Sequence, residues 1–308
     1  MRKTFIDTLV KEAKKDERIF LVCPDIGYSV LEVFRDQFPN RFLNVGVAEQ
    51  NAISIAAGLA LTGYIPFVYT IMPFVVMRPF EQIRIDVAYM NTNVRIVGVG
   101  AGFSYGAAGA THHSLEDIAI MRVLPGMTVI CPGDPWEVQQ SVKASINYKG
   151  PVYFRLGKQG EPILNDKTSS YQIGKATLIR NGDHVHLIST SNTLEISCKV
   201  AEALSSQNIN CSVTSMHTMK PFDVNYINSL LETCKPIFTI EEHYIVGGLG
   251  SAVSEVIAES KFNPLFKRFG VNDQFSHYVG GQDFIRDKFG INTEIITQEI
   301  LELLKKEK

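Results

Sequence analysis

The stretch Val45–Thr70, VGVAEQNAISIAAGLALTGYIPFVYT, decides the fold class of this chain. Because no charged side chain occurs in Gln50–Met77, a membrane span has to be weighed against shorter buried elements. Turn-forming residues interrupt the run at Gly58, Gly63, Pro66 and Pro73. The sequence therefore predicts a small-residue helix at Asn51–Leu61 and a short apolar strand at Ile65–Thr70, as in a buried α/β layer.

Strand-like and helix-like segments alternate around this stretch, which predicts a mostly parallel sheet covered by helices on both faces. The expected strands of the first half are Ile19–Val22, Phe42–Val45, Ile65–Thr70, Val94–Val99, Met127–Ile130 and Val152–Phe154. The expected helices are Thr4–Lys15, Val30–Gln37, Gln50–Leu61, Pro79–Met90, Leu115–Val123 and Pro135–Tyr148. Ser114-Leu115-Glu116-Asp117 is typical of a capping box, and Asp134-Pro135 of an N-cap before a first-turn proline.

A polar, turn-rich segment within Lys158–Gly174 interrupts the alternation and predicts a linker. With 308 residues the chain is about twice the usual domain size, so we expect two α/β domains, residues 1–165 and a smaller one at 174–308. The expected strands of the second domain lie near His184–Ile188, Asn210–Thr214 and Pro236–Ile240. Its expected helices lie near Leu194–Ser206, Val224–Thr233, Gly250–Glu259 and Thr293–Lys305.

The composition excludes several classes of protein. Hydrophobic residues make up 45% and charged residues 20%, which is typical of a globular rather than a disordered chain. The net charge of −2 argues against binding to nucleic acid. The 5 cysteines form no CxxC motif or Cys/His cluster, so we expect neither a zinc site nor a disulfide framework. An acidic residue at Asp7 comes too early for a signal peptide, which favours a reducing cytoplasm.

Glu49 is the first residue that points to chemistry, because it is a lone carboxylate at the start of the uncharged run. If it is buried, its pKa would be raised, which suits proton exchange or a hydrogen bond to a bound base. The alternative is an exposed acidic residue at a helix N-terminus, where the helix dipole favours a negative charge.

Two glycine-rich segments could also serve a ligand. Gly98–His113, GVGAGFSYGAAGATHH, follows an apolar strand, where open α/β sheets bind ligands, yet it matches neither the dinucleotide fingerprint nor a P-loop. Its His112 and His113 could handle protons or contact a ligand, or could be loop histidines with ordinary partners. Phe238–Gly250, FTIEEHYIVGGLG, fits either a ligand site or packing between domains or subunits.

Four motifs, in this order, resemble the transketolase family: VGVAEQNAISIAAGLA (45–60), RPFEQIRIDVAY (78–89), GATHHSLEDIAIMRVLPGM (109–127) and TIEEHYIVGGLGSAVSEV (239–256). They extend over most of the chain, which is also similar to the corresponding part of deoxyxylulose-phosphate synthase. The resemblance implies a pyrimidine-binding domain followed by the family's C-terminal domain. It implies the C-terminal subunit of a split transketolase, which transfers a two-carbon ketol unit from a ketose or its phosphate to an aldose.

The resemblance also implies a partner. Members of the family bind the tail of thiamine diphosphate through a domain with a GDG motif, whereas Gly133-Asp134 continues here into Pro135. We therefore expect a separate N-terminal subunit that carries this motif and holds the diphosphate and Mg²⁺ (or Ca²⁺), in a cytoplasmic α2β2 heterotetramer. This chain itself is expected to hold no metal.

By resemblance, Glu49 hydrogen-bonds N1′ of the aminopyrimidine and relays the proton that activates the cofactor, while the cofactor supplies the carbanion chemistry. Phe74 is the best match for the aromatic ring that stacks on the pyrimidine, and Phe80 is the second choice. Asp25 matches an aspartate close to the cofactor.

Ser29 and Arg155 match positions that contact a substrate phosphate, for which the planar arginine fork is well suited. His112 matches a catalytic histidine that contacts the hydroxyl end of the donor, and His113, which replaces a usual glutamine, is also expected at the substrate. The remaining departures are Gly100 in place of a substrate-binding histidine and Ala108 in place of an aspartate. Retained cofactor positions with altered substrate positions predict a sugar or sugar derivative outside the ordinary pentose-phosphate role.

Two other functions stay open at this point. The β subunit of a 2-oxoacid dehydrogenase has the same glutamate and domain order, but the GATHH and EQIRIDVAY motifs favour a transketolase. A non-catalytic regulatory subunit would explain the altered substrate positions, but it would have no need for Glu49.

Overall fold

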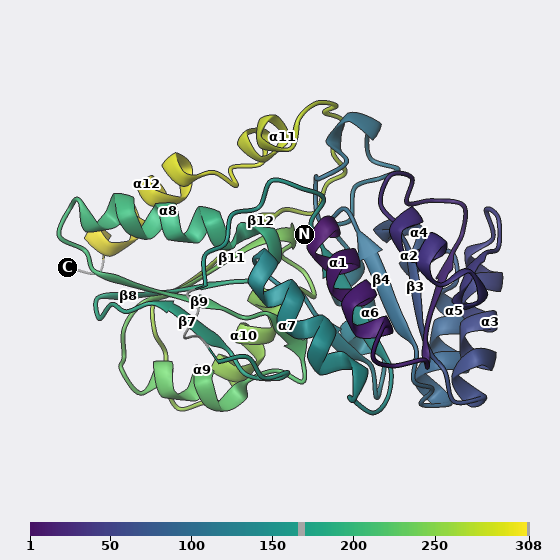
Figure 1. Ribbon diagram of the computed structural model, residues 1–308. Helices are drawn as coiled ribbons and strands as arrows, with labels where there is room; N and C mark the ends of the chain where they lie inside the picture. The colour runs from purple at the N-terminus through teal and green to yellow at the C-terminus, as the bar shows by residue number, and fades with distance from the viewer. Residues whose placement is uncertain (166–169, 307–308) are drawn as a thin grey trace.

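The computed structural model describes residues 1–165 and 170–306, which form two sheets side by side with helices packed on both. Figure 1 shows the first half of the chain in purple and blue and the second half in green and yellow. The expected α/β class is confirmed. None of the helices in these residues has the length and apolar character that crossing a membrane requires.

The first sheet has seven strands in the order β10-β5-β6-β4-β3-β1-β2. Every strand expected in the first half is present and runs parallel to its neighbours, whereas β10 comes from the second half and pairs antiparallel to β5. The bounds are β1 Ile19–Cys23, β2 Phe42–Asn44, β3 Ile65–Ile71, β4 Arg95–Val99, β5 Thr128–Ile130, β6 Val152–Leu156 and β10 Thr218–Lys220.

Helices cover both faces of this sheet. Buried side chains of α1, α2 and α7 form one core, and those of α3, α4, η2 and α6 line the other. The bounds are α1 Arg2–Ala13, α2 Glu32–Gln37, η1 Pro39–Arg41, α3 Glu49–Leu61, α4 Met72–Met77, α5 Phe80–Gln82, the π-helix η2 Ile83–Tyr89, η3 Gly106–Ala108, α6 Asp117–Val123 and α7 Pro135–Ile146.

The uncharged run is divided among α3, β3 and the short helix α4, which the sequence did not predict. The expected capping box at Ser114 is wrong. Helix α6 begins only at Asp117, because the Ser114 hydroxyl donates to the Asp117 side chain (3.1 Å) and the Ser114 backbone pairs with Gly102. The other expected cap is confirmed, since Asp134 accepts a hydrogen bond from the backbone N–H of Glu137 (2.7 Å) at the start of α7.

The second sheet has five strands in the order β12-β11-β8-β9-β7, with β7 antiparallel at one edge. The strands are β7 Thr177–Arg180, β8 Val185–Ser189, β9 Cys211–Ser215, β11 Ile237–Tyr244 and β12 Phe266–Val271. The helices are η4 Ser191–Thr193, α8 Leu194–Ser205, α9 Val224–Leu231, α10 Leu249–Ala258, α11 Gln282–Lys288 and α12 Thr293–Lys306. Strands β7, β10 and β12 and helix α11 are absent from the sequence-based prediction.

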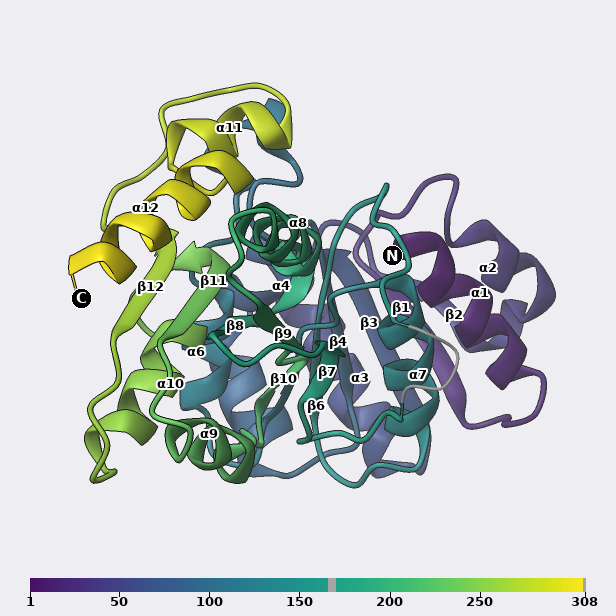
Figure 2. The ribbon, with the colours of Figure 1, turned by 90° about the vertical axis from the view of Figure 1, so that its left-hand side faces the viewer.

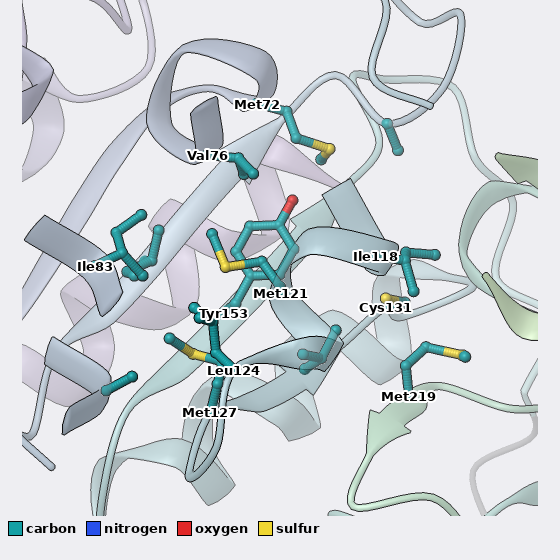
Figure 3. Packing of buried hydrophobic residues seen from close by; sticks show 14 of the residues in the cluster. Met72, Val76, Ile83, Ile118, Met121, Leu124, Met127, Cys131, Tyr153 and Met219 are labelled. Atoms are coloured by element: carbon teal, nitrogen blue, oxygen red, sulfur yellow. The ribbon is translucent and has the colours of Figure 1, made fainter. Parts of the chain in front are cut away.

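The two halves share a hydrophobic core. Its buried residues include methionines from both halves, and Figure 3 shows Met72, Met121 and Met127 around the ring of Tyr153. Met219, on β10, extends the same core from the second half of the chain. Figure 2 shows the two sheets from the side, with α11 above both and the segment after β4 reaching up to it.

The parallel strands of the first sheet carry the candidate residues to one edge. Loops that follow the carboxyl ends of parallel strands meet at the same side of a sheet, where ligands bind in α/β folds. The residues placed there are Asp25 and Ser29 after β1, Glu49 after β2, Phe74 after β3, His112 after β4 and Lys158 after β6.

Candidate active site

Glu49 is the first residue of α3 and its side chain is only 4% exposed. It accepts a hydrogen bond from the guanidinium of Arg78 at 2.8 Å. The partial positive charge of the helix N-terminus and the arginine both stabilise a carboxylate at this position. The alternative of an exposed helix-end residue is therefore wrong, and Glu49 is a buried carboxylate with Arg78 as its ion-pair partner.

Phe74 lies between Arg78 and His112. The Arg78 guanidinium carbon is 4.0 Å from the centre of the Phe74 ring, and the His112 ring meets Phe74 edge-on at 5.1 Å. Phe80, the second choice for the stacking aromatic, packs against the hydrophobic core instead. The fold thus connects Glu49, Phe74 and His112 through Arg78, which the sequence analysis missed, although it lies in one of the family motifs.

Asn44 fixes Asp25 relative to the start of α3. The Asn44 side-chain amide donates to the Asp25 carboxylate (3.0 Å), and its oxygen accepts from the backbone N–H groups of Asp25 (3.1 Å) and Gly46 (2.9 Å). Asp25 adopts a φ of 51°, a left-handed conformation that needs such support. One side chain therefore links the loop after β1 to the turn that leads into Glu49.

A cleft of about 740 Å³ lies beside the loop that carries Ser29. Its walls include the cationic side chains of Arg2, Lys3 and Lys158 and the carboxylates of Asp7 and Glu32. Lys3 pairs with Asp7 (2.7 Å), whereas Arg2 donates to the backbone carbonyl of Lys158 (3.0 Å). Several cations and a hydroxyl around one open space are suited to an anionic ligand. Ser29 was expected at a phosphate, whereas the three cations were not singled out from the sequence.

Tyr105 connects this cleft to the residues around Phe74. Its ring lies 4.7 Å from the Lys158 ammonium group and 6.4 Å from the His112 ring. The same ring occupies the space where a side chain at Gly100 would begin, and Gly100 has a φ of 97°. Gly100 stands where a histidine was expected because the Tyr105 ring occupies the space that a histidine side chain would need. Ala108 is exposed on the same loop.

His113 is buried behind this loop. Its ring meets Phe103 edge-on at 5.1 Å, and neither ring nitrogen has a hydrogen-bond partner within the described part of the chain. Burial lowers the pKa of His113, so the neutral ring is favoured at neutral pH. The expected contact between His113 and a substrate stays a prediction, and it would require the loop to move so that this buried ring becomes accessible.

Arg155, whose expected phosphate contact stays a prediction, is engaged by protein groups. The Arg155 guanidinium is fully buried, forms an ion pair with Asp117 (2.9 Å) and donates to the backbone carbonyls of Ser114 (3.1 Å) and Glu242 (2.9 Å). These three partners join residues of both halves of the chain at the Arg155 guanidinium. Residues 1–165 and 170–306 contain no group of three or more His, Cys, Asp or Glu side chains that could hold a metal ion.

Comparison with known proteins agrees with this geometry. The pyrimidine-binding domain of transketolase matches residues 1–162, and the transketolase C-terminal domain matches residues 174–296. The chain therefore belongs to the transketolase family.

Its relatives include separate transketolase subunits. The chain is 36% identical to the 6-deoxy-6-sulfo-D-fructose transketolase subunit of Clostridium sp., covering 99% of this chain and 95% of the relative. It is 37% identical to one subunit of the apulose-4-phosphate transketolase of Phocaeicola vulgatus, covering 99% and 97%. Among solved structures, an inactive β4 tetramer of a split-gene transketolase superimposes with a TM-score of 0.91 at 32% identity, covering 99% of this chain and 98% of that chain. Over nearly its whole length the chain thus corresponds to one subunit of a split transketolase, and the dehydrogenase alternative is not favoured.

Proposed function

We propose that this chain is the C-terminal subunit of a two-chain transketolase that moves a two-carbon ketol unit from an anionic ketose to an aldose. The observation that carries this proposal is the buried Glu49 carboxylate at the start of α3, connected through Arg78 to the ring of Phe74. A carboxylate that can share a proton and an aromatic face that can stack match the two chemical features of an aminopyrimidine. These residues therefore fit thiamine diphosphate.

Each residue has a defined task in this proposal. Glu49 would hold a proton at N1′ of the pyrimidine, Phe74 would stack on the ring, and Asp25, fixed by Asn44, would lie near the cofactor. Thiamine diphosphate, when bound, supplies the carbanion chemistry that cleaves a carbon–carbon bond. His112, which already contacts Phe74, would bind the hydroxyl end of the donor and act as its acid or base.

The proposal includes a partner chain over the open side of this site. Val47 and Met77 are apolar neighbours of Glu49 and Arg78 in the sequence, and their exposures are 74% and 41%. Exposed apolar side chains next to a functional group are typical of a surface that another chain covers. We assign to that chain the GDG motif, the diphosphate and Mg²⁺, in an α2β2 assembly. The tetramer of β chains superimposed above is described as inactive, in agreement with a need for the second type of subunit.

The substrate would carry its anionic group in the cleft beside Ser29. Arg2, Lys3 and Lys158 supply the positive charge there, and Tyr105 leads from Lys158 to His112. The names of the two relatives describe a sulfo sugar and a sugar phosphate, both of which are anionic. With Gly100 and Ala108 at altered positions, we infer a non-standard sugar of this anionic class.

Calorimetric titration with thiamine diphosphate and Mg²⁺ tests the two-chain proposal. The chain alone should give no measurable heat of binding, whereas a mixture with a subunit that carries the GDG motif should bind the cofactor and turn over an anionic ketose. Tight magnesium-dependent binding to the isolated chain would overturn the proposal. So would a mixture that binds the cofactor but transfers no ketol unit from any anionic ketose tested.

A further inference from the structure

The loop that carries His112 is closed at its base. Gly102 and Ser114 pair through two backbone hydrogen bonds of 3.1 and 3.0 Å, so residues 103–113 form a projection beyond this bridge. We call residues 103–113 the substrate loop. In Figures 1 and 2 it rises from β4 and lies beside α11, which belongs to the second half of the chain.

Glu242, on β11, holds the first residue of the substrate loop. One carboxylate oxygen accepts a hydrogen bond from the backbone N–H of Phe103 at 2.5 Å. The other oxygen accepts from Arg286 (2.7 Å), and Gln282 donates to both oxygens at 3.0 and 3.1 Å. The Glu242 side chain is fully buried, so these charge-assisted bonds form away from bulk water and are stronger than exposed ones.

The surrounding backbone is adapted to this contact. Gly102 has a φ of 60°, and a side chain there would overlap the Glu242 carboxyl group. Further along the loop, Gly106 lies so close to Gly280 that a side chain at Gly106 would overlap the Gly280 carbonyl group. The Phe103 ring also stacks on Phe289 at 5.2 Å. The substrate loop is thus held at several points by residues around α11.

We propose that Glu242, held by Arg286 and Gln282, is a positioning residue that fixes the substrate loop so that His112 faces Phe74. The carboxylate acts through the loop backbone and has no contact of its own with a reacting group. Its consequence for sugar binding rests on the proposed function, whereas its effect on the loop is a property of this chain alone. Residues of the second half of the chain would then help to position His112, which belongs to the first half.

Hydrogen–deuterium exchange of the full chain tests the effect on the loop. The groups that hold the Glu242 carboxylate, namely the Phe103 N–H, Gln282 and Arg286, are all hydrogen-bond donors. In a Glu242→Gln variant the side-chain NH₂ group, itself a donor, must therefore replace an acceptor either at Phe103 or at Arg286. We expect exchange of a peptide spanning 103–113 to accelerate at least about tenfold, while peptides from α3 and β3 keep the wild-type rate. Asp283→Asn is the matched control, because Asp283 also pairs with Arg286 but is 92% exposed.

The position of His112 gives a readout that a merely structural role would not move. The nearby Phe74 ring should shift the imidazole resonances of His112, which can be assigned in histidine-labelled protein with a His112→Gln variant. We expect Glu242→Gln, but not Asp283→Asn, to move the His112 resonances toward those of a free imidazole while the chain stays folded. Unchanged loop exchange and unchanged His112 resonances in a folded Glu242→Gln chain would overturn the proposal.

Two further measurements keep the outcome clear. If Glu242→Gln does not fold, Gln282→Leu removes a donor from the same carboxylate and should change loop exchange and the His112 signal in the same direction; no change there would also overturn the proposal. In the assembled enzyme, Glu242→Gln should raise KM for xylulose 5-phosphate, used as the probe, more than it lowers kcat. Absence of thiamine C2 proton exchange in the wild-type complex would instead count against the proposed function.

Discussion

The guanidinium of Arg78 and the carboxylate of Glu49 form an ion pair of 2.8 Å that connects the end of α4 to the start of α3. Glu49 is buried in this pair, whereas 43% of the Arg78 side chain is exposed. The arginine also covers the face of Phe74. One side chain thus joins the proposed proton-relay group to the proposed stacking ring.

A double-mutant cycle should detect this pair. Because Arg78 is partly exposed and screened by water, we expect a coupling free energy of about 1 kcal/mol between Arg78→Gln and Glu49→Gln in chemical denaturation. Arg84→Gln, a nearby exposed arginine, should show no coupling to Glu49→Gln. Additive effects of the Arg78 and Glu49 substitutions would show that the ion pair contributes nothing to stability.

The cationic cleft predicts selectivity for a charged sugar. Lys158→Met should lower the preference of the assembled enzyme for xylulose 5-phosphate over xylulose by roughly 10- to 150-fold, since a hydrogen bond to a charged group contributes about 1.5–3 kcal/mol. Arg2→Met should act in the same direction. Lys11→Met, on the exposed face of α1, serves as the control in steady-state kinetics. If the preference survives both substitutions in the cleft, the anionic group must bind elsewhere.

The altered substrate positions predict poor use of the standard donor. Without the histidine and aspartate that Gly100 and Ala108 replace, efficiency with xylulose 5-phosphate should lie at least roughly 5- to 150-fold below that of an ordinary transketolase, because even one lost hydrogen bond costs about 1–3 kcal/mol. A coupled kinetic assay measures this. Equal efficiency would show that the two departures are neutral.

Restoring the histidine alone should fail. At Gly100 a side chain would meet the Tyr105 ring and would have to adopt a φ of 97°, so Gly100→His should reduce the free energy of unfolding by about 1–3 kcal/mol. The double variant Gly100→His/Tyr105→Gly removes the overlap and should regain part of that stability, although the backbone strain persists. Thermal unfolding of both variants decides whether Tyr105 is the reason for the glycine.

His217 predicts a loss of stability in acid. Burial lowers the pKa of His217 to about 4, below the usual value of about 6.5, so the folded state binds fewer protons than the unfolded chain between these values. Stability from the neutral ring is therefore present above pH 6.5 and is lost as the pH falls toward 4. His217→Phe should reduce the slope of unfolding free energy against pH in this window, as measured by chemical denaturation at a series of pH values.

Much of the fold follows from local patterns in the sequence. Apart from the edge strand β2, the first-half strands are short apolar runs that are buried on both faces, and this composition gives a clear signal. Strand β7 and helix α11 gave no comparable signal, because β7 is a half-exposed edge strand and α11 buries only Ile285. Strand β10 was missed for another reason, since its pairing with β5 is a long-range contact that no local pattern encodes.

Candidate site residues could be predicted where they belong to a family motif. They could not be predicted where their role depends on the side chains that the fold brings next to them. Glu49 and Phe74 were predicted from the family motifs, and both side chains contact Arg78. The ion pair of Arg155 with the buried Asp117 could not be predicted, because an arginine at this position fits a phosphate as well as it fits a carboxylate. Lys158 was missed, because only the fold shows that it faces the same cleft as Arg2.

Proton–deuterium exchange at C2 of thiamine diphosphate, followed by NMR in the assembled complex, tests the role of Glu49 most directly. Glu49→Gln keeps the size of the side chain but cannot hold the N1′ proton as a carboxylate does. We predict that this variant folds, assembles and binds the cofactor, while C2 exchange falls by a factor on the order of 10² or more, the usual contribution of a positioned acid or base. Glu81→Gln, an exposed glutamate on α5, should exchange at the wild-type rate. A Glu49→Gln complex that binds the cofactor and also exchanges at the wild-type rate would contradict the catalytic account of this chain.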